Sequence, residues 1–416
     1  MFVLYEVLLY LVFLIGLPFF LVSGIIRGKY LANFPERLGI YRTSPKRHDL
    51  WFHAVSVGET LAARSVVDVL ERLRPGLQIV FTTTTITGQA QAKRLYPNAT
   101  VTYFPLEFAI SVRRFLDHHQ PRLFATMETE LWPNVTRISR KRGLRLVLAN
   151  GRISDRSFPR YRAFQPIVRR LLRKYDRILA REDLDRERFV AIGSPPEIVE
   201  TTGNVKFDYE PDTRPLEVAP LVEQLIAGRK VFVIGSTMQG EDEALVPLLP
   251  GFIAAHNAFV ILAPRKPERF DVVAGLLSGA GLSFVRRSAF PPAGKAGVLL
   301  VDVFGELARL YSFATVAFVG GTLVPTGGHN PIEPAAAGVP VCFGSSMSNF
   351  REIASLFLRN EAAKQVADAG EAIAFAQMMI NDEALQRAWG ERARRTVLQN
   401  RGASERTARG ILELLS

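Results

Sequence analysis

Glu59 is the residue of this sequence best suited to act as a general base. It follows a short apolar segment, 50–55, whose aromatic and β-branched residues predict a buried strand. Ser56 and Gly58 end this strand, and the spacing of apolar residues over 60–73 predicts a helix. We therefore expect Glu59 at the carboxyl end of a strand, where open α/β sheets bind ligands. The alternative is a carboxylate that only satisfies N–H groups in the first helical turn.

Two further carboxylates, Glu128 and Glu130, follow the predicted strand 122–127, and Pro133 then favours the start of a helix. Carboxylates at such a position are costly to bury unless they are solvated, paired or used. They can bind an acceptor hydroxyl or hold a basic side chain, although capping and salt-bridge roles are about as common. Lys206 lies in a polar segment at the end of the first half and is expected to face the same space.

The second half contains a glycine-rich strand-to-helix connection. Gly320 and Gly321 end a predicted strand, Gly327 and Gly328 follow, and a helix is predicted to begin near Pro331. Backbone N–H groups and a helix dipole at such a connection attract phosphate. A turn plus a helix cap is the alternative, but two glycine pairs are costly to keep for a turn alone.

Other side chains of the second half suit a nucleotide. Glu333 can accept hydrogen bonds from both ribose hydroxyls. Gly235 and Ser236 follow a predicted strand, and their small size lets N–H groups approach a phosphate. Arg265, directly after Pro264 at the end of the next strand, offers a rigid fork of donors. These residues predict a phosphate or nucleotide site.

These candidate residues are positioned by alternating strands and helices. The order βαβα predicts mainly parallel sheets, hence an α/β fold. At 416 residues, two domains are expected, and prolines mark a linker at 211–228. The predicted strands, besides 50–55 and 122–127, are 77–83, 100–104, 144–149 and 177–180, then 230–235, 258–263, 282–285, 297–301, 315–320 and 339–343.

Composition limits the partners. The formal net charge of +12 predicts an anionic partner: nucleic acid, an acidic membrane surface or an anionic substrate. The single cysteine, Cys342, excludes an intrachain disulfide, and the six histidines lack zinc spacing. We interpret the basic helical tail, 383–415, as a solvated face, with lipid-phosphate contact as the minority interpretation. The basic runs 137–142 and 169–174 can also face anionic lipid.

The segment 7–26 contains no charged residue and is about as long as a membrane-spanning helix requires. It lacks a basic region before it, so we interpret it as a retained anchor rather than a cleaved signal. Arg27, Lys29, Arg37 and Arg42 follow, which predicts a body on the cytoplasmic side. The alternative is a buried or monotopic helix.

Seven stretches together resemble the 3-deoxy-D-manno-octulosonic acid (Kdo) transferases. They occur in family order as HAVSVGE, METELWPN, NGRIS, TGNVKFD, APRKPERF, GELARLY and GGHNPIEPAAAG. The resemblance implies a GT-B fold, with two Rossmann-like domains facing across a cleft. It also implies an inverting transfer of Kdo from CMP-Kdo to a lipid A precursor, lipid IVA, in lipopolysaccharide biosynthesis at the bacterial inner membrane. Neither a metal nor a cofactor is implied.

The resemblance also implies roles for particular residues. Glu59 is the base that takes the proton of the acceptor hydroxyl, and Glu128 or Glu130 steadies the transition state with Lys206. The residues implied for CMP recognition are Pro264, Arg265, Gly305, Glu306, Leu307, Asn330, Pro331, Ile332 and Glu333. Supporting positions are Ser56, Gly58, Gly235, Ser236, Gly320, Gly327 and Gly328. The implied domains are an anchor helix (1–26), an acceptor-binding domain (27–210), a linker (211–228) and a CMP-sugar-binding domain with a helical tail (229–416).

Two alternatives stay open at this stage. One is a GT-B enzyme that uses another nucleotide sugar and a lipid-linked acceptor. The other is a basic, membrane-associated module without catalytic activity that binds nucleic acid or anionic lipid. Binding to nucleic acid is disfavoured, because the basic residues are spread over helices without interleaved aromatic residues.

Overall fold

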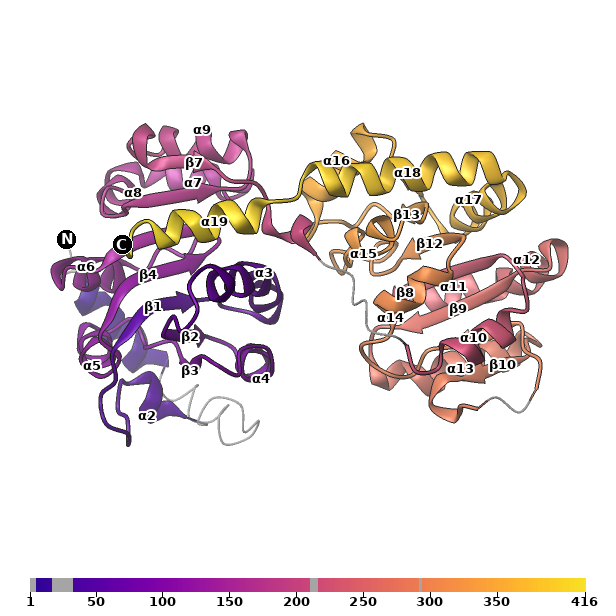
Figure 1. The fold of residues 1–416 in the computed structure, drawn as a ribbon, viewed down its shortest axis with the longest axis horizontal. Coiled ribbons are helices and arrows are strands. Elements are labelled where there is room, and N and C mark those ends of the chain that lie inside the picture. Colours follow the sequence, from indigo (N-terminus) through magenta and orange to yellow (C-terminus); the bar gives the residue numbers. More distant parts are fainter. Residues whose placement is uncertain (1–4, 17–32, 210–215, 292–293) are drawn as a thin grey trace. The chain divides into compact units, whose positions relative to one another are not determined.

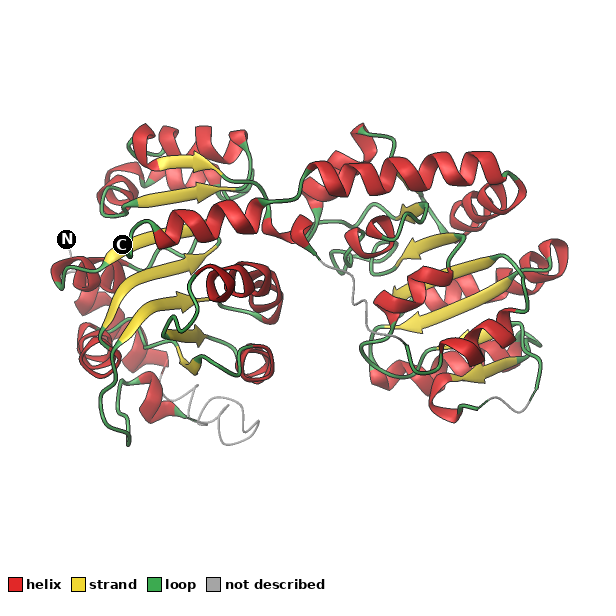
Figure 2. Cartoon of the chain, in the orientation of Figure 1, coloured by secondary structure: helices red, strands yellow, loops and turns green. Residues whose placement is uncertain are grey.

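The computed structural model describes residues 5–16, 33–209, 216–291 and 294–416. They form two compact units, unit 1 (Met1–Asp208 with Arg401–Ser416) and unit 2 (Tyr209–Asn400) (Figure 1). Each unit has a central layer of strands with helices on either side (Figure 2). Every strand pair in both sheets is parallel. The α/β prediction is therefore confirmed.

The sheet of unit 1 has the order β3-β2-β1-β4-β5-β6-β7. The strand order reverses between β1 and β4, and ligands of open α/β sheets bind at such a switch point. The strands are β1 (His48–His53), β2 (Ile79–Thr83), β3 (Thr100–Tyr103), β4 (Pro121–Met127), β5 (Arg145–Gly151), β6 (Arg177–Ala180) and β7 (Val199–Thr201).

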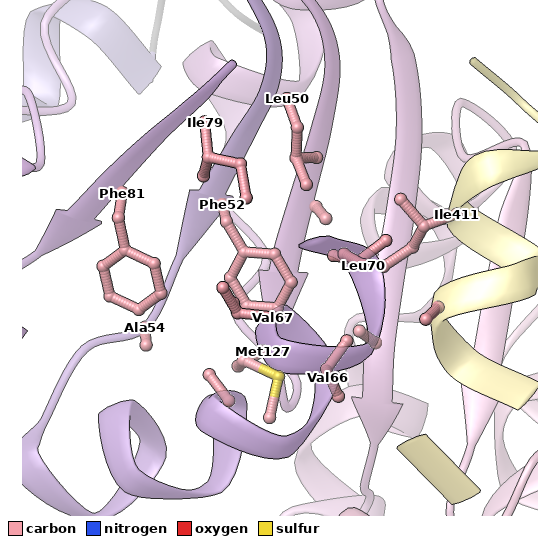
Figure 3. Close-up of a cluster of buried hydrophobic side chains, with 14 of the residues drawn as sticks. Leu50, Phe52, Ala54, Val66, Val67, Leu70, Ile79, Phe81, Met127 and Ile411 are labelled. Carbon is pink, nitrogen blue, oxygen red and sulfur yellow. The ribbon is translucent and has the colours of Figure 1, made fainter. Parts of the chain in front are cut away.

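Apolar side chains cover both faces of this sheet. Phe52 and Phe81 stack at a centroid distance of 5.7 Å on one face, where they pack with α3 (Figure 3), while Trp51 and Phe124 pack on the other. The helices of unit 1 are α2 (Phe34–Arg37), α3 (Val57–Leu73), α4 (Ile86–Leu95), α5 (Ala109–His119), α6 (Pro133–Lys141), α7 (Phe158–Ala163), α8 (Gln165–Leu172), α9 (Asp183–Ala191), η1 (Pro196–Ile198), η2 (Val205–Asp208) and α19 (Ala403–Leu412).

The sheet of unit 2 has the order β10-β11-β9-β8-β12-β13-β14, with its switch point between β8 and β12. The strands are β8 (Val231–Thr237), β9 (Phe259–Pro264), β10 (Phe284–Arg286), β11 (Val298–Leu300), β12 (Val316–Val319), β13 (Val341–Phe343) and β14 (Ala363–Gln365). The helices are α10 (Ala219–Ile226), α11 (Glu241–Leu245), η3 (Val246–Leu248), α12 (Leu249–His256), η4 (Pro267–Arg269), α13 (Phe270–Gly279), η5 (Arg287–Ala289), α14 (Leu307–Leu310), η6 (Tyr311–Phe313), α15 (Ile332–Ala336), α16 (Arg351–Arg359), α17 (Ala369–Asn381) and α18 (Glu383–Gln399).

The end of the chain differs from the predicted domain 229–416. The tail is helical as predicted, but α18 ends before Gly402, and α19 belongs to unit 1. Asp208 accepts hydrogen bonds from the N–H groups of Gly402 and Ser404, and Ile411 lies in the same apolar cluster as Leu70 of α3 (Figure 3). Burial of apolar side chains such as Ile411 stabilises the packing of α19 on unit 1. The basic composition of the tail gave no indication of this burial.

Residues 5–16 are helical and pack on unit 1. Tyr10 stacks on Phe108 at a centroid distance of 4.7 Å. The carboxylate of Glu6 accepts hydrogen bonds from the N–H of Ala109 at 2.9 Å and from the side-chain amide of Asn134 at 2.8 Å. Residues 17–26 of the predicted anchor lie outside the described residues. None of the helices that the structure describes has the length and apolar character needed to cross a membrane.

Candidate active site

Glu59 lies in the first turn of α3, next to the switch point of unit 1. Its carboxylate accepts hydrogen bonds from the N–H of Val55 at 2.8 Å and the hydroxyl of Ser56 at 3.0 Å, and its own N–H donates to the oxygen of Ser56 at 3.5 Å. This is a reciprocal helix cap, as the alternative interpretation predicted. Burial, and secondarily the charge of Glu128, nevertheless raise its pKa against these hydrogen bonds. Glu59 is therefore both a cap and a half-buried acid.

Glu128 follows β4 across the switch point and contacts Lys206. The Nζ atom of Lys206 lies 3.9 Å from Oε1 of Glu128, and both residues are among the groups that shift the pKa of Glu59. The structure thus brings these three predicted residues together. Glu128 has φ of 54°, a left-handed conformation that is uncommon for residues other than glycine. Such backbone conformations cluster at functional sites.

The segment that carries Lys206 is held by Asn150. Asn150 is the penultimate residue of β5 and has φ of 53°, and its Oδ1 atom accepts the N–H of Val205 at 3.3 Å. Two neighbouring strands therefore end in left-handed residues, one of which supplies a carboxylate while the other fixes the start of η2. Asn150 begins the NGRIS motif, whose sequence alone did not reveal this contact.

Glu130 is in a different environment from Glu128. Burial, with the charges of Glu59 and Glu128, raises its pKa to about 7. Over the described ranges, its carboxylate has no hydrogen bond or ion pair, whereas Glu128 faces Lys206. Three carboxylates and one ammonium group thus lie near the switch point, and the carboxylate of Glu130 is partly protonated at neutral pH.

Unit 2 contains a cavity of about 430 Å³, lined by Met238, Arg265, Lys266, Phe304, Thr326 and His329. Of the residues predicted to recognise CMP, only Arg265 lines it. Its guanidinium group has no hydrogen-bond or ion-pair partner within the described part of the chain. Burial and the charge of Arg265 lower the pKa of His329 to about 4, so the imidazole is neutral at pH 7. The cavity therefore combines cationic, neutral polar and apolar groups.

The Asn330–Glu333 segment turns back beside this cavity. Oδ1 of Asn330 accepts the N–H of Ile332 at 3.1 Å, and its amide group donates to Oε1 of Glu333 at 3.3 Å. Burial raises the pKa of Glu333, opposed by Asn330 and by the charge of Arg265. Pro331 precedes α15, as predicted. Asn330, Glu333 and Arg265 are thus grouped as the sequence suggested.

In the segment Gly305–Leu307, some of the groups that were predicted to contact CMP already have partners within the protein. Gly305 has φ of 84°, which favours glycine, and lies between Phe304 of the cavity wall and α14. The carboxylate of Glu306 is bound in a two-point ion pair by Arg287, at 2.7 and 2.8 Å. The side chain of Glu306 is therefore already engaged, and its carbonyl oxygen accepts the N–H groups of Arg309 and Leu310 at 3.0 and 3.1 Å.

The glycine connection differs from a simple phosphate loop. The N–H groups of Gly321 and Thr322 donate to the buried carboxylate of Glu241 at 2.6 and 2.8 Å. A side chain at Gly320 would lie 2.6 Å from the carbonyl oxygen of Ser236, so close backbone packing requires glycine there. Gly327 and Gly328 are buried against the segment 346–349. These glycines serve backbone packing, which their spacing alone did not reveal.

The remaining supporting residues border the switch points. Gly58 is exposed in the first turn of α3. Gly235 packs against Tyr311, whose hydroxyl would lie 2.3 Å from an added side-chain carbon. Ser236, near the end of β8, has φ of 58° and is a third left-handed residue at the carboxyl end of a strand. Pro264 is buried at the end of β9 and directs the chain to Arg265. Among the residues that the structure describes, no group of three or more His, Cys, Asp or Glu side chains is arranged to hold a metal ion.

Solved structures share this two-unit arrangement. A UDP-GlcNAc 2-epimerase from Neisseria meningitidis is similar with a TM-score of 0.59 and 12% identity, covering 89% of this chain and 99% of that one. MurG from Acinetobacter baumannii is similar with a TM-score of 0.54 and 14% identity, covering 88% and 100%. At this identity the likeness shows the fold alone, which is that of the GT-B glycosyltransferase class.

Sequence relatives define the family. Residues 32–209 match the family described as 3-Deoxy-D-manno-octulosonic-acid transferase (kdotransferase). A 3-deoxy-D-manno-octulosonic acid transferase of Haemophilus influenzae is 34% identical over 93% of this chain and 91% of its own length. One of Bordetella pertussis is 36% identical over 89% and 88%. The chain belongs to the 3-deoxy-D-manno-octulosonic acid transferase family, which confirms the resemblance inferred from the sequence.

Proposed function

We propose that this enzyme transfers Kdo from CMP-Kdo to a lipid A precursor, lipid IVA, in lipopolysaccharide synthesis, by one inverting displacement without a metal. The observation that carries the proposal is the grouping of Glu59, Glu128 and Lys206 at the switch point of unit 1. A base beside a carboxylate–ammonium pair suits the removal of a proton from an acceptor hydroxyl.

Glu59 is the proposed base. Its two hydrogen bonds hold the carboxylate in one orientation. Its raised pKa makes it a stronger base than an exposed glutamate. The capping interaction therefore supports the catalytic role, because it orients the group that must receive the proton.

Glu128, rather than Glu130, is the proposed partner of Lys206 in steadying the transition state. Lys206 lies 3.9 Å from Glu128, and its positive charge favours the ionised form of Glu59. Glu130, whose pKa is about 7, is partly protonated at neutral pH and holds less charge with which to orient a cation.

We assign donor binding to unit 2. Arg265, whose guanidinium group has no partner among the described residues, offers it to the phosphate of CMP-Kdo in the cavity of about 430 Å³. Glu333 and Asn330 are the candidates for the ribose, and the backbone of Gly305–Leu307 is the candidate for the base. The leaving CMP is already an anion, so cationic groups that stabilise it can replace an acid that protonates it.

Attachment to the inner membrane, with the catalytic body on the cytoplasmic side, belongs to the same proposal. The uncharged run 7–26 supports it, as do exposed apolar side chains in the helical residues 5–16, among them Val12 at 68% and Ile15 at 79% exposure. An anchor or an interfacial helix would keep the active site near a lipid acceptor.

The test is Glu59→Gln, assayed with CMP-Kdo and lipid IVA and read by mass spectrometry of the product. Loss of a general base should lower turnover by about 10²–10⁴-fold. Glu71→Gln, further along α3, is the matched control and should retain full activity. Near-normal turnover by folded Glu59→Gln would refute the base assignment. Product from a UDP- or GDP-sugar but not from CMP-Kdo would favour the alternative donor.

A further inference from the structure

The carboxylate of Glu241 is the most fully satisfied buried anion next to the donor cavity. The residue is 0% exposed at the start of α11. One oxygen, Oε1, accepts the N–H groups of Thr322 and Leu323 at 2.8 and 2.9 Å. The other, Oε2, accepts those of Gly321 and Met238 at 2.6 and 2.9 Å. No basic side chain pairs with it within the described ranges, so four backbone amides stabilise its charge.

Three of these amides are consecutive and converge on one point after β12. Successive N–H groups of this kind form a concave anion-binding nest, of the sort that elsewhere holds phosphate. Here the protein's own carboxylate occupies the nest. A phosphate group of a substrate can reach these amides only by displacing a buried side chain with four hydrogen bonds.

The loop that Glu241 holds also fixes part of the cavity wall. The carbonyl oxygen of Gly321 accepts hydrogen bonds from the N–H of Gly328 at 2.7 Å and from the hydroxyl of Thr326 at 2.9 Å. The carbonyl oxygen of Gly320 accepts the N–H of His329 at 3.3 Å. Thr326, His329 and Met238 all line the cavity. The carboxylate of Glu241 thus links two segments of the chain that form the wall of the cavity.

We propose that Glu241 is a positioning residue: its carboxylate fills the amide nest after β12 and thereby fixes the donor cavity, leaving the donor's phosphate to Arg265. This inference rests on the proposed donor site in unit 2. It deepens that proposal, because it removes the amides of Gly321–Leu323 from the groups that contact the phosphate.

Glu243 provides a matched control in the same helical turn. Its carboxylate accepts the N–H of Gly240 at 2.7 Å and pairs with Arg269 at 2.6 Å. It too is bound by a backbone N–H group near the start of α11, but it does not hold the loop after β12. A general effect of losing a carboxylate from α11 should therefore appear in Glu243→Gln, and an effect on the cavity should not.

The first experiment compares Glu241→Gln with Glu243→Gln by calorimetric titration with CMP and by initial rates with CMP-Kdo. We expect Glu241→Gln to weaken CMP binding and raise the KM for CMP-Kdo by at least about tenfold, a change of 1.4 kcal/mol or more. The kcat and the KM for the acceptor should change less than about threefold, as should every constant of Glu243→Gln. Wild-type CMP affinity in folded Glu241→Gln would overturn the inference.

The second experiment uses the wild-type protein, so it does not depend on a variant that folds. Amide hydrogen exchange is measured at residues 321–323 with and without saturating CMP. We expect these amides to be protected before CMP is added and unchanged afterwards, while the rest of the cavity wall gains protection. Amides that exchange freely and become protected only with CMP would show that they bind the phosphate, which contradicts our inference. Absence of any CMP binding by the wild type would instead refute the donor site itself, and the inference with it.

Discussion

The two switch points of this protein have the same topology and opposite chemistry. In unit 1, the strands β1 and β4 lead to Glu59 and Glu128, whose carboxylates lie near the cation of Lys206. In unit 2, the strands β8 and β12 lead to a carboxylate, Glu241, that is buried and bound by four amides, while Arg265 remains unpaired at the cavity among the described residues. The comparison shows that a parallel sheet fixes where a site forms, and that neighbouring side chains decide whether it offers negative or positive charge.

The largest effect that would test this comparison concerns the carboxylates of unit 1. Glu128→Gln should lower kcat by about 10²-fold, because it removes the negative charge that lies beside Lys206 and the reacting groups. It should also move the acidic limb of the pH–rate profile to lower pH, because Glu128 raises the pKa of Glu59.

Glu130→Gln is the matched variant and should retain activity within about fivefold. The reverse order of effects in steady-state assays would assign the role to Glu130.

A second, smaller effect concerns the cation of unit 2. Arg265→Gln should raise the KM for CMP-Kdo by about 10–100-fold, the loss expected for a charge-assisted contact with phosphate. Because Arg265 lowers the pKa of His329, that pKa should also rise, as followed by NMR titration. The control is Arg387→Gln on α18, where the arginine pairs with Glu383 on the surface. Equal changes in KM for both variants would argue against a specific donor contact.

The smallest expected effect compares the stability of the two units in acid. Burial lowers the pKa of both His53 and His119 in unit 1 from 6.5 to about 3. The folded state therefore disfavours their protonation, so their contribution to stability is present above pH 6.5 and is lost as the pH falls towards 3. At pH 5, each of the two histidines should lower the free energy of unfolding by about 2 kcal/mol, relative to its value above pH 6.5.

Two acids of unit 1 act in the opposite direction. The raised pKa values of Glu107 and Glu130, about 8 and about 7, stabilise the fold below about pH 4.5, and this contribution is lost as the pH rises towards those values. Because the acids and the histidines of unit 1 act in opposite directions, the test compares His119→Phe with the wild type by hydrogen exchange at pH 7.5 and pH 5. The variant lacks one histidine contribution, so unit 1 should gain protection relative to the wild type on going from pH 7.5 to pH 5, and unit 2 should not. An equal gain in both units, or no gain in unit 1, would contradict the prediction.

Local sequence predicted much of this molecule. Every predicted strand is present, because each is an apolar run bounded by glycine, proline or polar residues. The strands β7 and β14 were missed, since three residues such as Val199–Thr201 are too short to show a period. The capping alternative for Glu59 also followed from spacing alone, since Ser56 lies three residues earlier.

Contacts between distant segments could not be predicted in this way. Glu241 binds the loop after β12, which lies 80–82 positions away in the sequence. The acidic run at the start of α11 is typical of a helix terminus and gives no sign of this contact. Phe304 and Thr326 line the cavity although neither belongs to a quoted motif, and His329, which does belong to one, was given no role there. The choice between Glu128 and Glu130 depended on where Lys206 lies, which a Glu-x-Glu pattern cannot show.

The position of α19 has a consequence for synthesis of the chain. The apolar cluster beneath α3 contains Ile411 and Leu415, which the ribosome makes only after all of unit 2. Unit 2 can therefore complete its core before the last helix of unit 1 has been synthesised. A premature stop codon shortly before residue 403 should thus damage unit 1, most of which is translated first, and leave unit 2 intact.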